Sequence, residues 1–471
     1  MSATVNRRQF ARLTAFAGVG ALLVACSSSP PSSPASAMQP TVAATASRTQ
    51  AAAAKPAAQA ATAMVLGEIH FLCRADIVTA YGAKAAVKGF SDAHPGAKMT
   101  LDKPPQGANL LVKARAAIAS NSLAWDGYSV MVPPWDTASW VDSGVIQPLN
   151  DFISASTEPD ATKLVPGIIS TVREAMQYKG KMYAIPGNVG SSVLQWYWAP
   201  LKQIGLDKQP TTWDETYQAA QQIKQKDHKL IPFAPILEPL CGFETLFFAA
   251  TPPKDLFISS GGYTGLMNIQ GDGAIVALEW MKKMVTAGLM PPTAQNISDD
   301  WNRKQVAMLM SYDVMGEDAQ KTYGYDAADT GVNIFPKAGE INGGTPFWVN
   351  SSVVFNKAKN PQGMTDFYIW WFGPSNGPAQ QTMVATAAKP CYSYTYDKYV
   401  KNSTKFGWEQ VGIDLVAKSQ PYPVNTYQYL QENALSPWID KYLAPGSTLT
   451  AKDAMKSAAS DIANKLAAQA G

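Results

Sequence analysis

The chain has 471 residues, of which 46% are hydrophobic and 16% are charged, and this length accommodates about two or three domains with large cores. Its 39 basic residues nearly balance its 36 acidic residues, and five of the basic ones lie before Gly67, which leaves 34 against 36 in the rest of the chain. Nucleic-acid binding depends on many unopposed Lys and Arg side chains, so the composition excludes that function class.

The N-terminus has the organisation of an export signal. Arg7 and Arg8 precede an apolar run from Leu13 to Ala25, and this run ends at Cys26. A helix needs about 20 apolar residues to cross a bilayer, so the run is too short for a membrane span. The arginine pair followed by Phe10 resembles the twin-arginine signal, and residues 23–26 resemble a lipobox. We therefore expect residues 1–25 to be an export signal and Cys26 to be lipidated; an amphipathic first helix is the alternative.

Residues 26–66 consist mostly of Ser, Pro, Ala, Thr and Gln. Such a segment cannot bury enough apolar area to offset the entropy of ordering, which predicts a flexible tether. No later segment contains about 18 consecutive apolar residues. We expect an exported globular body, held by its lipid anchor at the outer face of the cytoplasmic membrane, at the cell surface or in the periplasm.

The first part of the body alternates predicted strands with predicted helices. Strands are expected at residues 68–73, 98–102 and 127–132, and helices at residues 77–93 and 109–120. Strands that alternate with helices of ten or more residues favour an α/β fold with a parallel sheet.

Three further helices have recognisable N-terminal residues. Thr212 and Glu215 have capping-box spacing, Asp272 is expected to cap a helix that stops at Gly288, and Thr450 precedes the last helix. The apolar stripe of the last helix consists of Met455, Ala458, Ile462 and Leu466.

The ends of the predicted strands give the first candidate ligand-binding residues. In open α/β sheets, ligands bind at the carboxyl ends of the strands. Arg74 and Asp76 follow the first strand, and Trp135 and Asp136 follow the third. Arg74 suits an acidic ligand, although a surface salt bridge explains it equally well.

Few residues support catalysis. The three histidines, His70, His94 and His228, have no zinc-ligand spacing. Residues 373–377 match the G-x-S-x-G pattern, but no histidine follows His228, so a turn is the better interpretation. No phosphate-binding glycine motif occurs. We expect a protein that is not an enzyme and that uses no metal or cofactor, although two carboxylates of a glycosidase would leave no sequence signature.

The cysteines that follow Cys26 are Cys73, Cys241 and Cys391, an odd number at wide spacing. At most one disulfide can form among them, and three free thiols are an equal alternative.

Several blocks, in chain order, resemble the family 1 extracellular solute-binding proteins of ABC importers, the class that includes maltose-binding protein. Trp198 stands where the family usually has Asn, and Tyr312 and Asp313 stand where it often has Gly-x-Trp. The matching blocks are residues 125–128 with 139–149, which are similar to "D-strand-loop-helix-G-x-(I/L)-x-P-L"; 178–186, similar to "GK-x-Y-x-x-P"; 195–198; 304–310, similar to "G-x-x-A-M"; and 451–466.

The resemblance implies a two-lobed periplasmic-binding-protein fold of type II with the ligand between the lobes. Lobe one would comprise residues 67–187 and 349–388, and lobe two residues 188–348 and 389–471. Hinge segments would lie near residues 186–190, 343–350 and 387–390, where glycines can absorb the dihedral changes of closure.

Further candidates for ligand binding follow from the resemblance and from sugar chemistry. Sugar sites combine stacking aromatic side chains with a few polar partners. Glu238, which precedes Pro239, resembles a sugar-contacting Glu-Pro pair. For each aromatic residue, packing in the core is the alternative. The further candidates are Trp196 or Tyr197, with Trp198 as competitor, and Tyr312, Asp313, Trp348 and Tyr427 (or Tyr429).

The predicted function is that of a substrate-binding lipoprotein of an ABC importer, a monomer that captures a carbohydrate, expected to be an oligosaccharide, and delivers it to the permease subunits. The alternatives are a binding protein for an acidic or phosphorylated solute and a membrane-anchored glycan-processing enzyme. The low charge of the body favours a neutral, polyhydroxylated ligand.

Overall fold

The computed structural model describes most of the body of the chain and none of the first 66 residues. The described residues are 67–73, 82–102, 110–131, 137–235, 239–292, 297–312, 329–333, 336, 338, 345–385, 389–400, 420–423 and 427–470. The expected export signal, Cys26 and the expected tether lie outside this set. None of the helices within the described part is long and apolar enough to cross a membrane.

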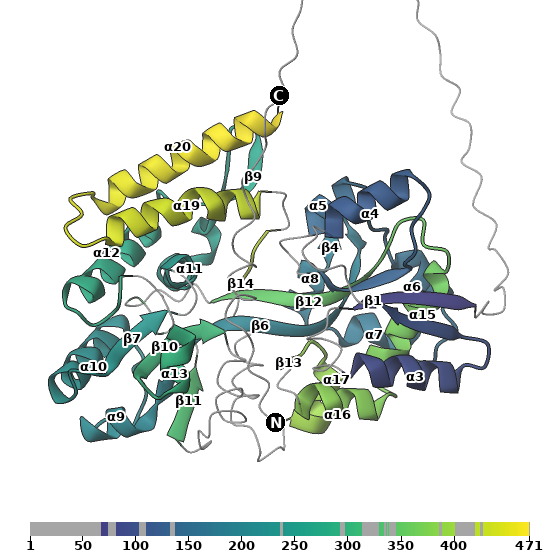
Figure 1. Cartoon of the computed structure of the whole chain (residues 1–471), viewed down its shortest axis with the longest axis horizontal. Helices are drawn as coiled ribbons and strands as arrows, with labels where there is room; N and C mark the ends of the chain where they lie inside the picture. Colours follow the sequence, from purple (N-terminus) through teal and green to yellow (C-terminus); the bar gives the residue numbers. More distant parts are fainter. Residues whose placement is uncertain are drawn as a thin grey trace, which may run out of the picture. The chain divides into compact units, whose positions relative to one another are not determined.

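Strands and helices alternate from β1 to α5 and follow one another less regularly after that (Figure 1). Up to the long strand β6 they are β1 (Glu68–Cys73), α3 (Ala83–Ala93), β2 (Lys98–Asp102), α4 (Leu110–Ala119), β3 (Gly127–Met131), α5 (Thr137–Asp142), α6 (Asn150–Ala155), α7 (Ala161–Gly167), α8 (Ser170–Ala175), β4 (Gln177–Tyr178), β5 (Lys181–Met182) and β6 (Ala184–Tyr197).

The middle of the chain adds α9 (Trp198–Gln203), α10 (Trp213–Lys226), β7 (Ile231–Pro235), α11 (Pro239–Ala250), η1 (Pro253–Asp255), β8 (Phe257–Ser260), β9 (Tyr263–Met267), α12 (Asp272–Thr286), α13 (Ile297–Asn302), β10 (Val306–Tyr312) and β11 (Thr330–Asn333). The last part adds β12 (Pro346–Val354), α15 (Pro361–Phe372), α16 (Gly377–Ala385), β13 (Lys389–Pro390), α17 (Ser393–Thr395), η3 (Tyr396–Val400), β14 (Gln420–Pro421), α19 (Gln428–Leu443) and α20 (Ala451–Ala470).

The main sheet is mixed, whereas the alternation of elements at its start favoured a parallel one. Over the described residues its strand order is β2-β1-β3-β12-β6-β10-β7. The first three strands are parallel, as predicted, and so are β10 and β7. The long strands β6 and β12 run antiparallel to each other and to their outer neighbours, β10 and β3. This antiparallel pair joins two parallel groups of strands, so the fold is α/β with a mixed sheet.

Two hydrophobic cores lie at opposite ends of β6. The first core takes in apolar side chains between Ile69 and Val189, between Phe347 and Phe372, and at 383–392. The second core takes in side chains between Leu194 and Met310 and between Tyr422 and Leu466. We call the surrounding parts of the chain the first and the second region.

The extent of the first core differs from the expected lobe boundary in one place. Residues 389–471 were expected to belong to lobe two, but the buried side chains of Cys391 and Tyr392 lie in the first core. The Tyr392 hydroxyl also donates to the Pro186 carbonyl at 2.7 Å. The chain therefore stays in the first region through Tyr392 and contributes to the second core again at Tyr422.

Three predicted helix ends are confirmed, and two predictions need correction. The helix expected over residues 77–93 is not continuous, because Gly82 has a φ of 65° and is the N-cap of α3. Thr212 and Glu215 form the reciprocal capping box, and Thr450 accepts from the Asp453 amide at 3.1 Å at the start of α20. Gly288 has a φ of 68° just after α12. The N-cap of that helix is Gly271 and not Asp272, which is its first helical residue. An acidic residue in the first turn still interacts favourably with the helix dipole.

Candidate functional site

The three segments expected to act as hinges lie side by side in the sheet. Residues Val349 and Asn350 of β12 pair with Val189 and Asn188 of β6. Lys389 and Pro390 of β13 pair with the same two residues of β6. Since a strand has only two edges, β12 and β13 occupy opposite edges of β6 at this point. Segments that are about 160 and 200 residues apart in the chain thus meet between the two cores. Their role as hinges stays a prediction.

Backbone features at this place are irregular. The pairing of β12 with β6 shifts in register between Asn350 and Ser351, which marks a β-bulge or similar irregularity. Opposite this shift, a Cβ atom added to Gly187 would lie 3.2 Å from the Asn350 carbonyl oxygen. The strands approach closely here because residue 187 is glycine.

Neutral polar side chains are concentrated on β6, β10 and β12, which we call the crossing strands. Gln195 donates through Nε2 to Ser311 Oγ at 2.8 Å, so β6 and β10 are joined by side chains as well as by backbone pairing. Thr345 Oγ1 donates to the Ser192 carbonyl at 2.6 Å. Buried polar groups such as these must be hydrogen-bonded, and they hold the strands in a single register. The buried polar residues of β6, β10 and β12 are Asn188, Ser191, Ser192, Gln195, Ser311, Ser351 and Ser352.

Two of the sequence-predicted site residues flank the middle of β6. Tyr312, at the end of β10, pairs with Ser192, and Trp348, on β12, pairs with Gly190. Their backbones therefore lie on opposite edges of residues 190–192. Nothing is described of either side chain, so ligand contact by Tyr312 and Trp348 stays a prediction.

Trp196 and Tyr197 lie on opposite faces of the end of β6, as alternation predicted. Trp196 is 3% exposed and packs in the second core, where it meets Trp198 edge-on at 5.5 Å between ring centroids. Tyr197 is half-buried against a small cluster around Trp301, and the ammonium of Lys304 lies 5.5 Å from its ring centroid. Both side chains thus have packing roles in the described structure, and their contact with ligand is untested.

Tyr427 is also a packing residue in the described structure. Its ring meets Tyr263 edge-on at a centroid distance of 5.0 Å and packs against the second core just before α19. The remaining candidates, Arg74, Asp76, Trp135, Asp136, Glu238 and Asp313, lie outside the described residues.

Sequence reasoning gave no structural role to Asp126, the acidic residue of the first matching block. Asp126 is 2% exposed, and its two carboxylate oxygens accept from the backbone amides of His70 at 2.8 Å and Asn360 at 2.7 Å. It therefore ties β1 to the start of α15. The sequence feature that could have predicted this role is the position of Asp126 directly before β3, because a carboxylate there can accept hydrogen bonds from the backbone amides of neighbouring segments.

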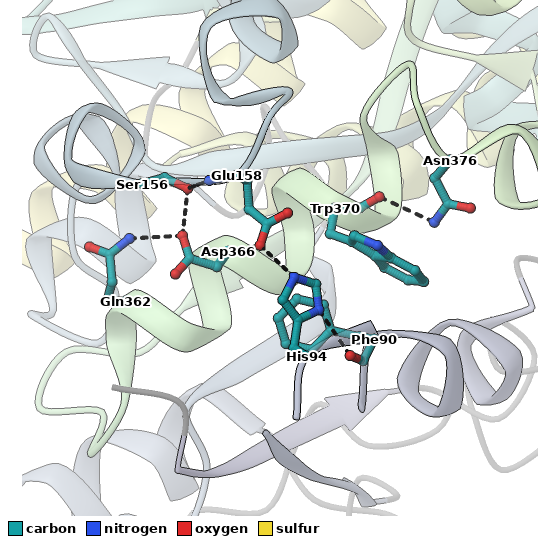
Figure 2. A network of polar contacts seen from close by, with 8 residues as sticks. All are labelled: Phe90, His94, Ser156, Glu158, Gln362, Asp366, Trp370 and Asn376. Carbon is teal, nitrogen blue, oxygen red and sulfur yellow. Dashed lines mark hydrogen bonds and ion pairs between the residues drawn. The ribbon is translucent and has the colours of Figure 1, made fainter. Parts of the chain in front are cut away.

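A second polar cluster lies in the first region, away from the crossing strands (Figure 2). The His94 ring contacts the Phe90 carbonyl through Nδ1 at 2.9 Å and Glu158 Oε1 through Nε2 at 2.9 Å. A carbonyl oxygen only accepts hydrogen bonds, so Nδ1 of His94 carries a proton. A hydrogen bond between His94 Nε2 and Glu158 Oε1 requires a second proton, on one of these two atoms. Burial raises the pKa of Glu158.

The same cluster contains a second buried carboxyl. Asp366 Oδ1 accepts from Ser156 Oγ at 2.6 Å and from Gln362 Nε2 at 2.9 Å, and burial raises the pKa of Asp366. All of these groups have protein partners, so the cluster joins α3, α15 and the chain before α7 (Figure 2). It forms no metal site, because the described residues contain no group of three or more His, Cys, Asp or Glu side chains placed to hold an ion.

Two of the cysteines are free thiols. Cys73 and Cys391 are both buried in the first core and neither is disulfide-bonded, while the side chain of Cys241 is not among those described. Burial raises the pKa of Cys391 well above its ordinary value. The thiolate is the reactive form, so this cysteine is protected from oxidation and exchange.

The fold is shared with solved sugar-binding proteins of low sequence identity. The GacH receptor of Streptomyces glaucescens, solved without ligand and with acarbose, is 18% identical, with a TM-score of 0.67 over 85% of this chain and 98% of that one. The cyclic alpha-maltosyl-1,6-maltose binding protein of Arthrobacter globiformis is 17% identical, with a TM-score of 0.71 over 85% and 99%. An ABC substrate-binding protein of Listeria monocytogenes, in complex with cycloalternan, is 15% identical, with a TM-score of 0.69 over 85% and 99%.

These likenesses establish the fold that the sequence blocks predicted, which is the two-lobed fold of maltose-binding-type proteins. No curated protein matches the chain by sequence. The family profile named bacterial extracellular solute-binding protein matches residues 85–403, more than half of the chain. This chain therefore belongs to the bacterial extracellular solute-binding proteins.

Proposed function

We propose that this protein is the substrate-binding lipoprotein of an ABC importer, which captures a neutral oligosaccharide outside the cytoplasm and delivers it to permease subunits. The proposal rests above all on family membership combined with a fold whose solved representatives are described with acarbose, cycloalternan or maltotetraose. The family and these neighbours are binding proteins, not enzymes.

The chemistry of the crossing strands supports a neutral ligand over an ion. Seven buried Asn, Ser and Gln residues occupy β6, β10 and β12. Among the described residues of these three strands none is charged, and the nearest charged neighbour in the sheet is Lys389 on β13. A phosphorylated or acidic solute requires several basic groups, whereas sugar hydroxyls are satisfied by neutral donors and acceptors.

The residues that we propose for ligand contact come from the strand ends and the crossing strands. Aromatic rings would stack on the apolar faces of the sugar and the polar groups would bind hydroxyls. Packing in the described structure makes Trp196, Tyr197 and Tyr427 weaker candidates than the others. The stronger ones are Arg74, Asp76, Trp135, Asp136, Glu238, Tyr312, Asp313 and Trp348.

Ligand binding is tested by a thermal-shift screen with maltose, maltotetraose, acarbose, sugar phosphates, glycerol phosphates and polyamines. A ligand at 100 times its Kd stabilises the native state by about 2.7 kcal/mol, so a true ligand raises the Tm by several degrees. We expect neutral oligosaccharides to do so, with quenching of Trp fluorescence and no release of product. A shift with phosphorylated compounds alone, or turnover of an oligosaccharide, would overturn the proposed ligand class or the binding function, respectively.

A pair of tryptophan variants locates the site. Trp348→Ala is expected to weaken oligosaccharide binding by about tenfold or more, because loss of a stacking ring in a sugar site costs upwards of about 1.4 kcal/mol. Trp370→Ala is the matched control, since Trp370 lies on α15 at the rim of the first core. Equal oligosaccharide affinities in the two variants would show that Trp348 does not contact the ligand.

Lipid anchoring is a separate part of the proposal and has its own test. We expect the mature chain to begin at Cys26 and to partition into the membrane fraction of the producing cell, where more than one acyl chain is needed for stable attachment. Cys26→Ser should release the protein from that fraction without changing its affinity for sugar. Membrane association that persists in Cys26→Ser would refute the anchor.

A further inference from the structure

A groove in the second region is lined by none of the residues proposed for sugar binding. It has a volume of about 580 Å³ and is lined by residues of the β8–β9 hairpin, α19 and α20. Helix α19 contacts both α20 and β9 (Figure 1). Small-molecule sites in proteins occupy about 300–1,000 Å³. Nine of its sixteen lining residues are aliphatic or methionine, including Ile258, Leu266, Ile269, Ile462 and Leu466. Besides Gln431 and Lys456, the polar lining residues are Ser260, Tyr263, Gln270 and Ser460. We call it the α20 groove.

One buried polar group in the α20 groove has an unused donor. Gln431 is 0% exposed, and its Oε1 accepts from the Met267 backbone amide at 2.7 Å. This bond fixes the orientation of the carboxamide, because an amide N–H can be accepted only by the oxygen. The Nε2 group then has no hydrogen-bond partner among the described residues. A buried donor without a partner is destabilising, and an acceptor bound in the groove would remove that cost.

The charge of the groove lining selects among possible occupants. Lys456, exposed on α20, is the only charged residue that lines the groove in the described structure, and it makes no ion pair with a described residue. Ile258, at the edge formed by β8, is 40% exposed and offers apolar surface to an incoming molecule. The groove therefore combines apolar walls, one buried donor and one positive charge. A sugar would leave most of its hydroxyls unpaired against such walls.

We propose that the α20 groove is a second binding site, which takes a free medium-chain fatty acid. The hydrocarbon chain lies along the aliphatic walls, a carboxyl oxygen accepts from Gln431 Nε2, and Lys456 favours a negatively charged ligand over a positive one. Burial of each CH₂ group adds to the affinity, so a chain of about ten carbons supplies most of it. The site is independent of sugar capture.

Calorimetric titration of the intact protein with two matched amphiphiles tests the proposal. The probes are decanoate and decyltrimethylammonium, both kept below their critical micelle concentrations. Decanoate is expected to bind saturably at one site and the cation, which has no oxygen acceptor, to bind at least about tenfold more weakly, since one hydrogen bond and one charge differ. Equal binding of the two probes, or none by decanoate, would overturn the proposal.

Variants of the groove separate specific binding from adsorption. Ala463→Trp fills the groove from the exposed side of α20 and should abolish decanoate binding, while Ala468→Trp, on the same helix but outside the lining, should leave it unchanged. Gln431→Glu keeps the acceptor for the Met267 amide but replaces the donor, and should weaken decanoate binding about tenfold. Lys456→Gln should weaken it by about two- to fivefold, with Lys452→Gln as its control. Decanoate binding that survives Ala463→Trp would refute the site.

Two readouts keep this test separate from sugar capture and from folding. Each variant should retain the wild-type circular-dichroism spectrum and the wild-type thermal shift with whichever oligosaccharide stabilises the protein. If no oligosaccharide binds but decanoate binding behaves as described, the proposed sugar function fails while the second site stands. Binding to phosphatidylglycerol vesicles without binding to free decanoate would show a membrane contact in place of a fatty-acid site and would overturn it.

Discussion

The two regions joined by β6 are stabilised in different ways. Buried carboxyl groups hold the first region together: of the five buried acidic residues in the described structure, Asp126, Glu158, Asp160 and Asp366 lie there, and only Glu244 lies in the second region. The second core contains seven buried methionines against four in the first and relies on apolar packing around α11 and α12. Methionine and phenylalanine packing does not depend on protonation, whereas buried carboxyls titrate. Burial raises the pKa of Glu158 and Asp366 in the first region and of Glu244 in the second, so the stability of the first region should respond to pH at two carboxyl groups and that of the second at one.

The largest effect is expected from Asp126→Ala. The change removes two charge-assisted hydrogen bonds and leaves the His70 and Asn360 amides without their acceptor. Loss of two such bonds should lower the free energy of unfolding by about 3–5 kcal/mol, as measured by urea denaturation. A loss below about 1 kcal/mol would show that carboxylate bonding does not hold the first region together.

Gly127→Ala, in the same matching block, tests packing in the first region without changing charge. A Cβ atom at residue 127 would lie 2.4 Å from the Tyr368 hydroxyl oxygen and 2.7 Å from Met364 Cγ. Forcing α15 away from β3 should cost about 2–3 kcal/mol of stability. Gly144→Ala is a useful contrast, because nothing lies within 4 Å of an added Cβ there and only its φ of 68° opposes the substitution. If Gly144→Ala lowered the free energy of unfolding more than Gly127→Ala, backbone strain would contribute more to stability at these positions than side-chain packing.

Gly331→Ala makes the corresponding test in the second region. An added Cβ would meet the Trp196 indole at 2.2 Å, so glycine at 331 allows β11 to lie against that ring. Residue 331 is only half-buried, and we expect a loss of about 1–2 kcal/mol together with a change in Trp fluorescence. Unchanged fluorescence and stability would mean that Trp196 does not need the close approach of β11.

Asp366→Asn should show the pH dependence of the first region. Burial raises the pKa of Asp366 above its unfolded value, which is about 3.9 for aspartate. The folded state then binds protons more tightly than the unfolded state, so wild-type stability decreases as pH rises from about 4 through the raised pKa. The carboxamide of the variant keeps an acceptor for Ser156 and Gln362 but does not titrate, so the variant should become more stable relative to wild type as pH rises from about 4 to about 7.

Urea denaturation at about pH 4 and about pH 7 measures that difference. The control is Glu215→Gln in the second region, where hydrogen bonds from Thr211 lower the pKa of the carboxyl. Its stability contribution is present above the unfolded pKa and is lost as pH falls, so this variant should change in the opposite sense. Parallel changes in both variants would contradict the assigned directions.

The smallest effect is expected from Lys304→Gly, in the turn just before β10. Lys304 has a φ of 60°, in the left-handed region, at the position where the "G-x-x-A-M" element of the family has glycine. Relief of that strain is worth about 1 kcal/mol, partly offset by the greater freedom of glycine in the unfolded chain and by loss of the contact with Tyr197. We expect a gain of at most about 1 kcal/mol in thermal denaturation. Destabilisation would show that the Lys304–Tyr197 contact outweighs the strain.

Local sequence patterns were sufficient to predict the strands β1 and β2, the helix α4, and the starts of α10 and α20. These depend on alternation, periodicity and capping within a few residues, which the chain carries in its own order. The ordered blocks likewise predicted the fold, because several of them contain residues with a definite local structure, whereas the hinge role of the three segments stays a prediction. The "GK" block, for example, is a β4–β5 hairpin whose turn residues Lys179 and Gly180 both have positive φ.

Only the tertiary structure decided which long-range partners these elements have. Three features depend on residues more than a hundred positions apart. They are the antiparallel pairing of β6 with β12 between the cores, the packing of Cys391 and Tyr392 in the first core, and the burial of Trp196. The same holds for the bond between Asp126 and Asn360 and for the bond between Gln431 and Met267, while the bond between Asp126 and His70 spans 56 positions. Sequence spacing sets the conformation of neighbouring residues, whereas burial and hydrogen-bond partners are set by packing between distant segments, and that physical difference divides what could be predicted here from what could not.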